Sequence, residues 1–120
     1  MKQYTKTHEW IEIEENCALV GITDYAQKEM GDIVYAELPE TGAEVVYGES
    51  VCELESVKAV APVNSPATGK VVEVNGALED KPELVNQSSE NEGWLYKMEI
   101  TGETVELMDK AAYEKYLKTL

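Results

Sequence analysis

The sequence has no arginine, a single histidine and two cysteines, and it contains no long apolar run. A membrane-spanning helix needs about 18 apolar residues or more in succession, so we do not expect the chain to cross a membrane. All ten basic residues are lysines, so no guanidinium is available to clamp a phosphate or a carboxylate through two bonds. The single histidine, His8, lacks the partners that a His-based metal site or a catalytic triad requires, and we interpret it as structural.

Positive charge as a whole is also scarce. The chain has 24 acidic residues against 10 basic ones, which gives a formal net charge of -14. A field of this sign repels the phosphates of nucleic acids and anionic lipid headgroups. We therefore predict that neither nucleic acid nor a membrane is a partner. The acidity favours solubility, and it also favours long-range steering toward enzymes that carry basic docking surfaces.

Cys17 and Cys52 lie in separate apolar, strand-like stretches and form no closely spaced metal or redox motif. We predict that both are buried free thiols, which a reducing compartment would keep unpaired. The N-terminal segment resembles neither an apolar signal sequence nor an arginine-rich presequence. The cytoplasm is therefore the expected location, with a mature mitochondrial form as the alternative.

The length of 120 residues fits a single domain that covers residues 1–120. Short apolar runs between turns rich in Gly and Pro predict a mainly β fold. The predicted strands are His8–Ile13, Cys17–Ile22, Ile33–Leu38, Val51–Leu54, Lys70–Val74 and Trp94–Ile100. Caps and helical spacing predict a short helix over residues 24–30, ended by Gly31, and a C-terminal helix over residues 109–119. The polar stretch 86–93 is predicted to be an exposed loop.

A strand, a tight turn and a second strand are predicted around Lys58. Residues 51–55 and 60–63 have strand character, and the turn between them consists of Ser56, Val57, Lys58 and Ala59. Lys58 is therefore expected at the tip of a hairpin, where an enzyme could reach its amine. Lysines on surface turns commonly serve only to solvate a sheet edge, so the chemistry of Lys58 alone does not define a function.

Several motifs follow one another in a fixed order along the chain. They are Tyr4-Thr5, His8-Glu9-Trp10, Val20-Gly21-Ile22-Thr23-Asp24-Tyr25-Ala26-Gln27, Met30-Gly31-Asp32-Ile33-Val34, Glu37-Leu38-Pro39, Glu55-Ser56-Val57-Lys58-Ala59, Ser65-Pro66 with Gly69, Asn75, Pro82 with Leu84-Val85-Asn86, and Gly93-Trp94-Leu95. In this order and spacing they resemble the H-protein family of the glycine cleavage system over nearly the whole chain. The run around Lys58 resembles the lipoylation motif of that family. The resemblance implies a barrel-sandwich hybrid of two antiparallel sheets, as in lipoyl domains.

The resemblance further implies that Lys58 carries covalently attached lipoate and that the chain is a carrier rather than an enzyme. The lipoyl arm would shuttle an aminomethyl group from glycine decarboxylase, the P-protein, to the aminomethyltransferase, the T-protein. Its electrons would pass to dihydrolipoyl dehydrogenase, the L-protein. A lipoate ligase or a lipoyl or octanoyl transferase would attach the group. Biotin is disfavoured, because biotin-carrying domains usually place methionines on both sides of the lysine and Val57 and Ala59 stand there in this chain.

The resemblance also points to residues around the arm. Glu9 occupies the strand position that matches the arm cleft of the family, where its carboxylate could pair with the cationic amine of the loaded arm. The alternative for Glu9 is one more solvated acid among 24. Glu53 and Glu55 are candidates for recognition by the lipoate-attaching enzyme, with edge-strand solubility as the alternative. Trp10 and Trp94 are predicted to pack in the core and at its edge.

Three features of the sequence depart from the family pattern. The strand after Lys58, residues 59–64, is less polar than in many relatives, which leaves open what that strand contributes to a cleft. Residues 88–90 lack the Pro-Tyr pair that commonly precedes Gly-Trp, and Met30 stands where leucine is more usual. Two other functions also stay open on the sequence alone: a relay that hands lipoyl groups to other acceptor proteins, and an unmodified interaction domain.

Overall fold

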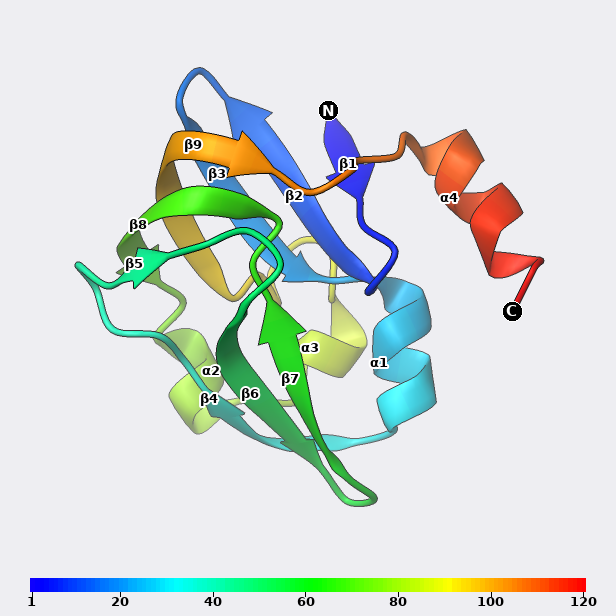
Figure 1. Cartoon of the computed structure of the whole chain (residues 1–120). Helices are drawn as coiled ribbons and strands as arrows, with labels where there is room; N and C mark the ends of the chain where they lie inside the picture. Colours follow the sequence, from blue (N-terminus) through cyan, green and yellow to red (C-terminus); the bar gives the residue numbers. More distant parts are fainter.

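Two antiparallel sheets form the body of the protein in the computed structural model, which describes residues 1–120 (Figure 1). The larger sheet has the strand order β1 (Lys2–Tyr4), β2 (Glu9–Glu14), β3 (Cys17–Ile22), β9 (Tyr96–Thr104), β8 (Ala67–Val74) and β5 (Glu44–Val45). The smaller sheet has the order β4 (Ile33–Glu37), β6 (Ser50–Ser56) and β7 (Val60–Asn64). The predicted mainly β fold of two antiparallel sheets is confirmed. The prediction lacks β1 and β5, which are too short to produce a period of two in the sequence.

Two helices were predicted, and both are present. Helix α1 (Asp24–Met30) is capped by Thr23, whose Oγ1 accepts the Ala26 N–H at 3.2 Å, and it ends at Gly31 with φ 81°. Helix α4 (Lys110–Leu117) is capped by Asp109. Two single turns of helix, α2 (Ala77–Asp80) and α3 (Leu84–Gln87), were not predicted, because four residues show no helical periodicity.

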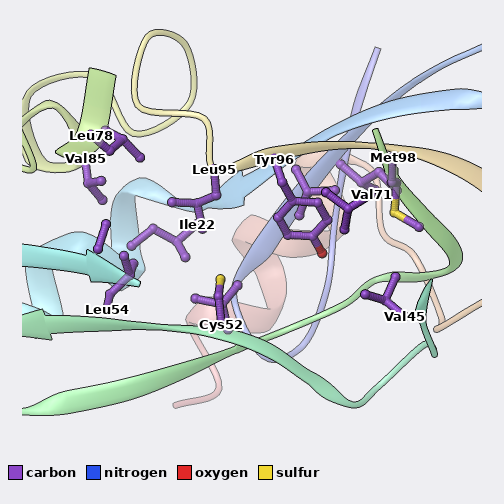
Figure 2. Close-up of a cluster of buried hydrophobic side chains, with 14 of the residues drawn as sticks. Ile22, Val45, Cys52, Leu54, Val71, Leu78, Val85, Leu95, Tyr96 and Met98 are labelled. Carbon is purple, nitrogen blue, oxygen red and sulfur yellow. The ribbon is translucent and has the colours of Figure 1, made fainter. Parts of the chain in front are cut away.

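The core lies between the two sheets, where alternate residues of each strand face inward. Figure 2 shows Leu54 of β6 and Cys52 facing Ile22, Leu95 and Tyr96 across this layer. The short helices α2 and α3 contribute Leu78 and Val85, which have exposed fractions of 1% and 0%. These helices therefore close one end of the layer.

A second, smaller cluster lies beneath α4. It consists of Tyr4, Trp10, Met108 and Tyr113. The rings of Tyr4 and Tyr113 stack with centroids 4.8 Å apart, and Tyr4 and Met108 exchange two backbone hydrogen bonds of 2.8 Å. The C-terminal helix is thus tied to the N-terminal strand, as Figure 1 shows on the right of the molecule.

The prediction of an exposed loop over residues 86–93 is wrong in part. Residues 86 and 87 belong to α3, and Ser89 is buried. The Asn86 side chain accepts the Ile33 N–H and donates to the Gly31 carbonyl, while the Ser89 carbonyl accepts the Trp10 indole N–H at 2.9 Å. Polar residues are present here because they satisfy buried donors and acceptors of neighbouring segments.

The two cysteines differ in burial. Cys52 is buried as predicted, whereas Cys17 is only half-buried, because it stands at the start of β3 on the outer face of the larger sheet. Both thiols are free. No helix of the structure has the length and apolar character needed to cross a membrane.

Candidate functional site

Lys58 lies at the tip of the β6–β7 hairpin, which extends from the body of the molecule (Figure 1). Ser56 closes the turn: its N–H donates to the Ala59 carbonyl at 2.8 Å, and its Oγ accepts the N–H groups of Lys58 and Ala59 at 3.2 and 3.1 Å. These bonds hold the backbone of the turn from within. The side chain of Lys58 is exposed and forms no ion pair.

The hairpin tip rests on the junction between α1 and β4. The Val57 N–H donates to the Asp32 carbonyl at 3.0 Å. The stem of Lys58 passes over Gly31, where an added Cβ would come within 3.1 Å of the lysine Cε. The bare backbone of Gly31 therefore leaves room for the lysine stem beside the end of α1.

A cavity of about 210 Å³ runs between α1 and β7. It is lined both by Met30, the neighbour of the glycine that Lys58 covers, and by Glu9. Its lining consists of Thr7, His8, Glu9, Ile22, Tyr25, Ala26, Glu29, Met30, Leu54, Ala61, Pro62 and Val63. We call this cavity the α1–β7 cleft. Two departures from the family pattern, Met30 and the apolar β7, line it, so the cleft wall beside Lys58 is largely apolar.

Glu9 is buried, with 3% of its surface exposed, so its interpretation as a solvated acid is wrong. Its carboxylate accepts hydrogen bonds from the hydroxyls of Thr5 and Thr7, and the Asn64 N–H points to it at 3.4 Å. No lysine pairs with it. Burial raises the pKa of Glu9, and the hydrogen bonds from Thr7 and Thr5 oppose that rise only in part.

The buried carboxylate predicts a pH-dependent stability. The pKa of Glu9 is higher in the folded protein than in the unfolded chain. The folded state therefore loses stability as the pH rises from the pKa of the unfolded chain to that of the folded protein. The Glu9→Gln variant lacks this ionisation. We expect its melting temperature to be higher than that of the wild type at pH 7 and equal to that of the wild type near pH 4, as measured by thermal unfolding. Glu14→Gln, an exposed change on the same strand, is the control. A Glu9→Gln protein no more stable than wild type at pH 7 would contradict the expectation.

Glu53 and Glu55 lie on the outer face of the smaller sheet. Residues 52, 54 and 56 of β6 point inward, and Glu53 and Glu55 point to solvent. Across the sheet, Tyr35 and Val60, each 57% exposed, flank Glu55, and Glu37 and Pro62 flank Glu53. The strand that leads to Lys58 therefore presents carboxylates beside exposed apolar side chains.

Some residues of the site were not predicted. Thr5 and Thr7 contact the Glu9 carboxylate, and Tyr25 and Tyr113 contact His8. Thr5, Thr7 and Glu9 share a spacing of two, which could have indicated a common face. Tyr113 lies 105 residues from His8, and no local pattern connects them. Trp10 is buried as predicted, and Trp94 is half-buried. No group of three or more His, Cys, Asp or Glu side chains is placed to hold a metal ion.

A small two-sheet β protein that presents one lysine at a hairpin tip has the architecture of a swinging-arm carrier. The sequence matches the family described as glycine cleavage H-protein over residues 2–120. A glycine cleavage system H protein of Thermotoga maritima is 55% identical over 118 residues, covering 97% of this chain and 95% of that protein. A probable glycine cleavage system H protein of Thermococcus gammatolerans is 54% identical, covering 98% of this chain and 90% of that protein.

The fold agrees with this match. The crystal structure of a glycine cleavage system H protein from Mycobacterium marinum superposes with a TM-score of 0.92 at 38% identity, covering 99% of this chain and 97% of that chain. The chain belongs to the glycine cleavage H-protein family. It is accordingly a carrier component of the glycine cleavage system and not itself a catalyst.

Proposed function

We propose that Lys58 carries a lipoyl group in amide linkage and that the β6–β7 hairpin presents this arm to the enzymes of glycine cleavage. The observation that carries the proposal is the exposed, unpaired amine of Lys58 on a turn that Ser56 holds closed. An amine without a carboxylate partner can enter the active site of a modifying enzyme without breaking an ion pair. The Ser56 bonds keep the anchor in place while the arm moves.

The residues of the α1–β7 cleft fit a lipoyl arm. The arm is an aliphatic chain with a sulfur-containing end, and the cleft has apolar walls from Met30, Leu54 and Pro62. When bound, the lipoyl group supplies a disulfide that takes up the aminomethyl group and becomes reduced. Glu9, in the lining of the cleft, offers a carboxylate to the cationic amine of that cargo. The cleft excludes water from the cargo, which is unstable toward hydrolysis.

The partners follow from this role. We propose that the P-protein loads the arm, that the T-protein unloads it and that the L-protein reoxidises it. A lipoate ligase or a lipoyl or octanoyl transferase attaches the group. This enzyme recognises Glu53 and Glu55 on the exposed face of the strand that leads to Lys58. The net charge of -14 steers the chain toward basic docking surfaces on these enzymes. Residues 1–120 act as one carrier domain, and relatives in bacteria and archaea support a cytoplasmic location.

Intact mass spectrometry tests the attachment. Protein expressed in cells supplied with lipoate should gain the mass of one lipoyl group, and peptide mapping should assign it to Lys58. Protein from cells unable to attach lipoate, which should keep the mass of the unmodified chain, is the control. An unmodified Lys58 in the lipoate-supplied cells, with other lipoyl proteins of those cells modified, would contradict the proposal. A gain on any of the other nine lysines would contradict the assignment of the site.

A further inference from the structure

The hydroxyl of Tyr113 lies at the meeting point of three elements. Tyr113 belongs to α4 and is 4% exposed. Its Oη lies 2.7 Å from Oγ1 of Thr23, the residue that caps α1, and 2.8 Å from Nδ1 of His8, the residue that precedes β2. One side chain of the C-terminal helix thus joins the start of α1 to the start of β2.

Both joined segments contribute to the lining of the α1–β7 cleft. His8 and Glu9 line it from the start of β2, and Tyr25, Ala26, Glu29 and Met30 line it from α1. The ring of His8 lies 4.7 Å from the ring of Tyr25, and the Thr23 N–H donates to the His8 carbonyl at 3.0 Å. His8 has φ 72°, in the left-handed region, which is uncommon for residues other than Gly but is adopted more often by Asn, Asp and His than by the rest.

We propose that Tyr113 is a positioning residue of the arm cleft, whose hydroxyl sets the spacing of the cleft walls by holding His8 against the cap of α1. The proposal rests on the proposed function of Lys58 in taking the α1–β7 cleft as the shelter of the arm. The hydroxyl is not needed to dock the helix, because the Tyr113 ring stacks on Tyr4 and the backbone bonds between Tyr4 and Met108 hold the preceding segment. Its polar contacts are to His8, which lines the cleft, and to Thr23, which caps the helix that lines it.

No other side chain makes these two contacts. Thr23 is fully buried, and its Oγ1 already accepts the Ala26 N–H, so Tyr113 is its only side-chain partner. His8 Nδ1 likewise has only Tyr113. Burial lowers the pKa of His8, with Glu29 opposing, and this favours the neutral ring in a cleft that takes a cationic cargo.

The Tyr113→Phe variant tests the proposal, with Tyr116→Phe as the matched control. Tyr116 lies on the same helix with its ring 6.1 Å from that of His8, and its hydroxyl donates to the Lys6 carbonyl at 3.3 Å and not to His8, so the change to Phe removes a hydroxyl that His8 does not use. His8 is the only histidine, so its ring gives a single NMR titration curve. We expect the pKa of His8 to rise toward its ordinary value in Tyr113→Phe, because the freed ring becomes better solvated, and to stay unchanged in Tyr116→Phe. This measurement uses the unmodified protein.

A second measurement follows the arm itself. Reduced lipoyl protein is loaded with formaldehyde and ammonia, so that a thiol, formaldehyde and ammonia give an S–CH₂–NH₂ group and water. The rate at which this group is lost to water is then measured. We expect the loss to be severalfold faster in Tyr113→Phe, because the change in wall spacing admits water to the group, and unchanged in Tyr116→Phe. Equal loss rates in wild type and a folded Tyr113→Phe would overturn the proposal, and so would equal acceleration in both variants.

A double variant separates positioning from general stability. His8→Asn removes the ring, and asparagine tolerates the φ value of this position. If Tyr113 acts through His8, then adding Tyr113→Phe to His8→Asn should not further increase the rate at which the S–CH₂–NH₂ group is lost to water. Additive effects would overturn the proposal. Should Tyr113→Phe fail to fold, His8→Asn alone must increase the rate at which the S–CH₂–NH₂ group is lost. A wild-type rate in His8→Asn would then overturn the proposal. If the wild type takes up no lipoyl group, the proposed function fails, while the His8 titration still decides the role of Tyr113.

Discussion

The Lys58→Arg variant should lose all covalent modification and all carrier activity while keeping its fold. Arginine retains the positive charge, but its guanidinium stays protonated and does not serve as an acylation nucleophile. Lys58 is exposed and unpaired, so the change in the free energy of unfolding should stay within about 0.5 kcal/mol. The measurements are intact mass, thermal unfolding, and glycine-dependent release of carbon dioxide with the partner enzymes of the system.

Lys70→Arg is the matched control, because Lys70 is an exposed lysine on β8, in the other sheet from the hairpin. It should be modified at Lys58 and active like the wild type. Full activity of Lys58→Arg would refute the swinging-arm mechanism. Loss of lipoylation with retained activity would instead favour an unmodified interaction domain, the alternative left open by the sequence.

The Gly69→Ala variant should destabilise the protein severely. Gly69 lies in β8 between β5 and β9, and a Cβ added there would come within 1.9 Å of the Glu99 carbonyl oxygen and 2.9 Å of Met98 Cε. The obstacle is the backbone of the neighbouring strand, so the two strands must separate locally. We expect a loss of about 3 kcal/mol or more in the free energy of unfolding. For a chain of this size that loss lowers the melting temperature by roughly 10 °C.

Gly76→Ala is the control for this prediction. Gly76 has φ -60°, in the helical region, and an added Cβ would meet nothing within 4 Å. Its stability should equal or slightly exceed that of the wild type, since alanine loses less backbone entropy on folding. Chemical denaturation of both variants measures the difference. A Gly69→Ala protein within 1 kcal/mol of the wild type would mean that the strands β8 and β9 can part without loss of packing.

Much of the architecture could be predicted from local sequence signals. The limits of β3 agree residue for residue with the prediction, and α1 covers residues 24–30 and ends at Gly31 as expected. The hairpin around Lys58 was predicted as strand, turn and strand, and it is present as such. These features depend on contacts between residues close in sequence, which is why alternation, caps and turn residues reveal them.

The environment of the site could not be predicted in the same way. Glu9 was left between a cleft residue and a solvated acid, and its burial results from threonine hydroxyls on one side and the Asn64 backbone on the other. Residues 86–93 are polar, and the sequence therefore predicted an exposed loop. In the structure Asn86 and Ser89 satisfy backbone and indole groups of α1, β4 and β2. Polarity shows that a residue needs hydrogen-bond partners, but it does not show whether water or protein supplies them.

The sequence by itself determined the β-rich class, the hairpin with Lys58 at its tip and the family, because these depend on short-range patterns and on motifs in a fixed order. Only the tertiary structure decided that Met30, Pro62 and Glu9 line one cleft, and that Tyr113 joins its walls from the far end of the chain. The physical reason is that a cleft is made by segments that meet through packing. The contacts that bring α1, β2, β7 and α4 together involve residues tens of positions apart in the sequence, and no local sequence pattern indicates such contacts.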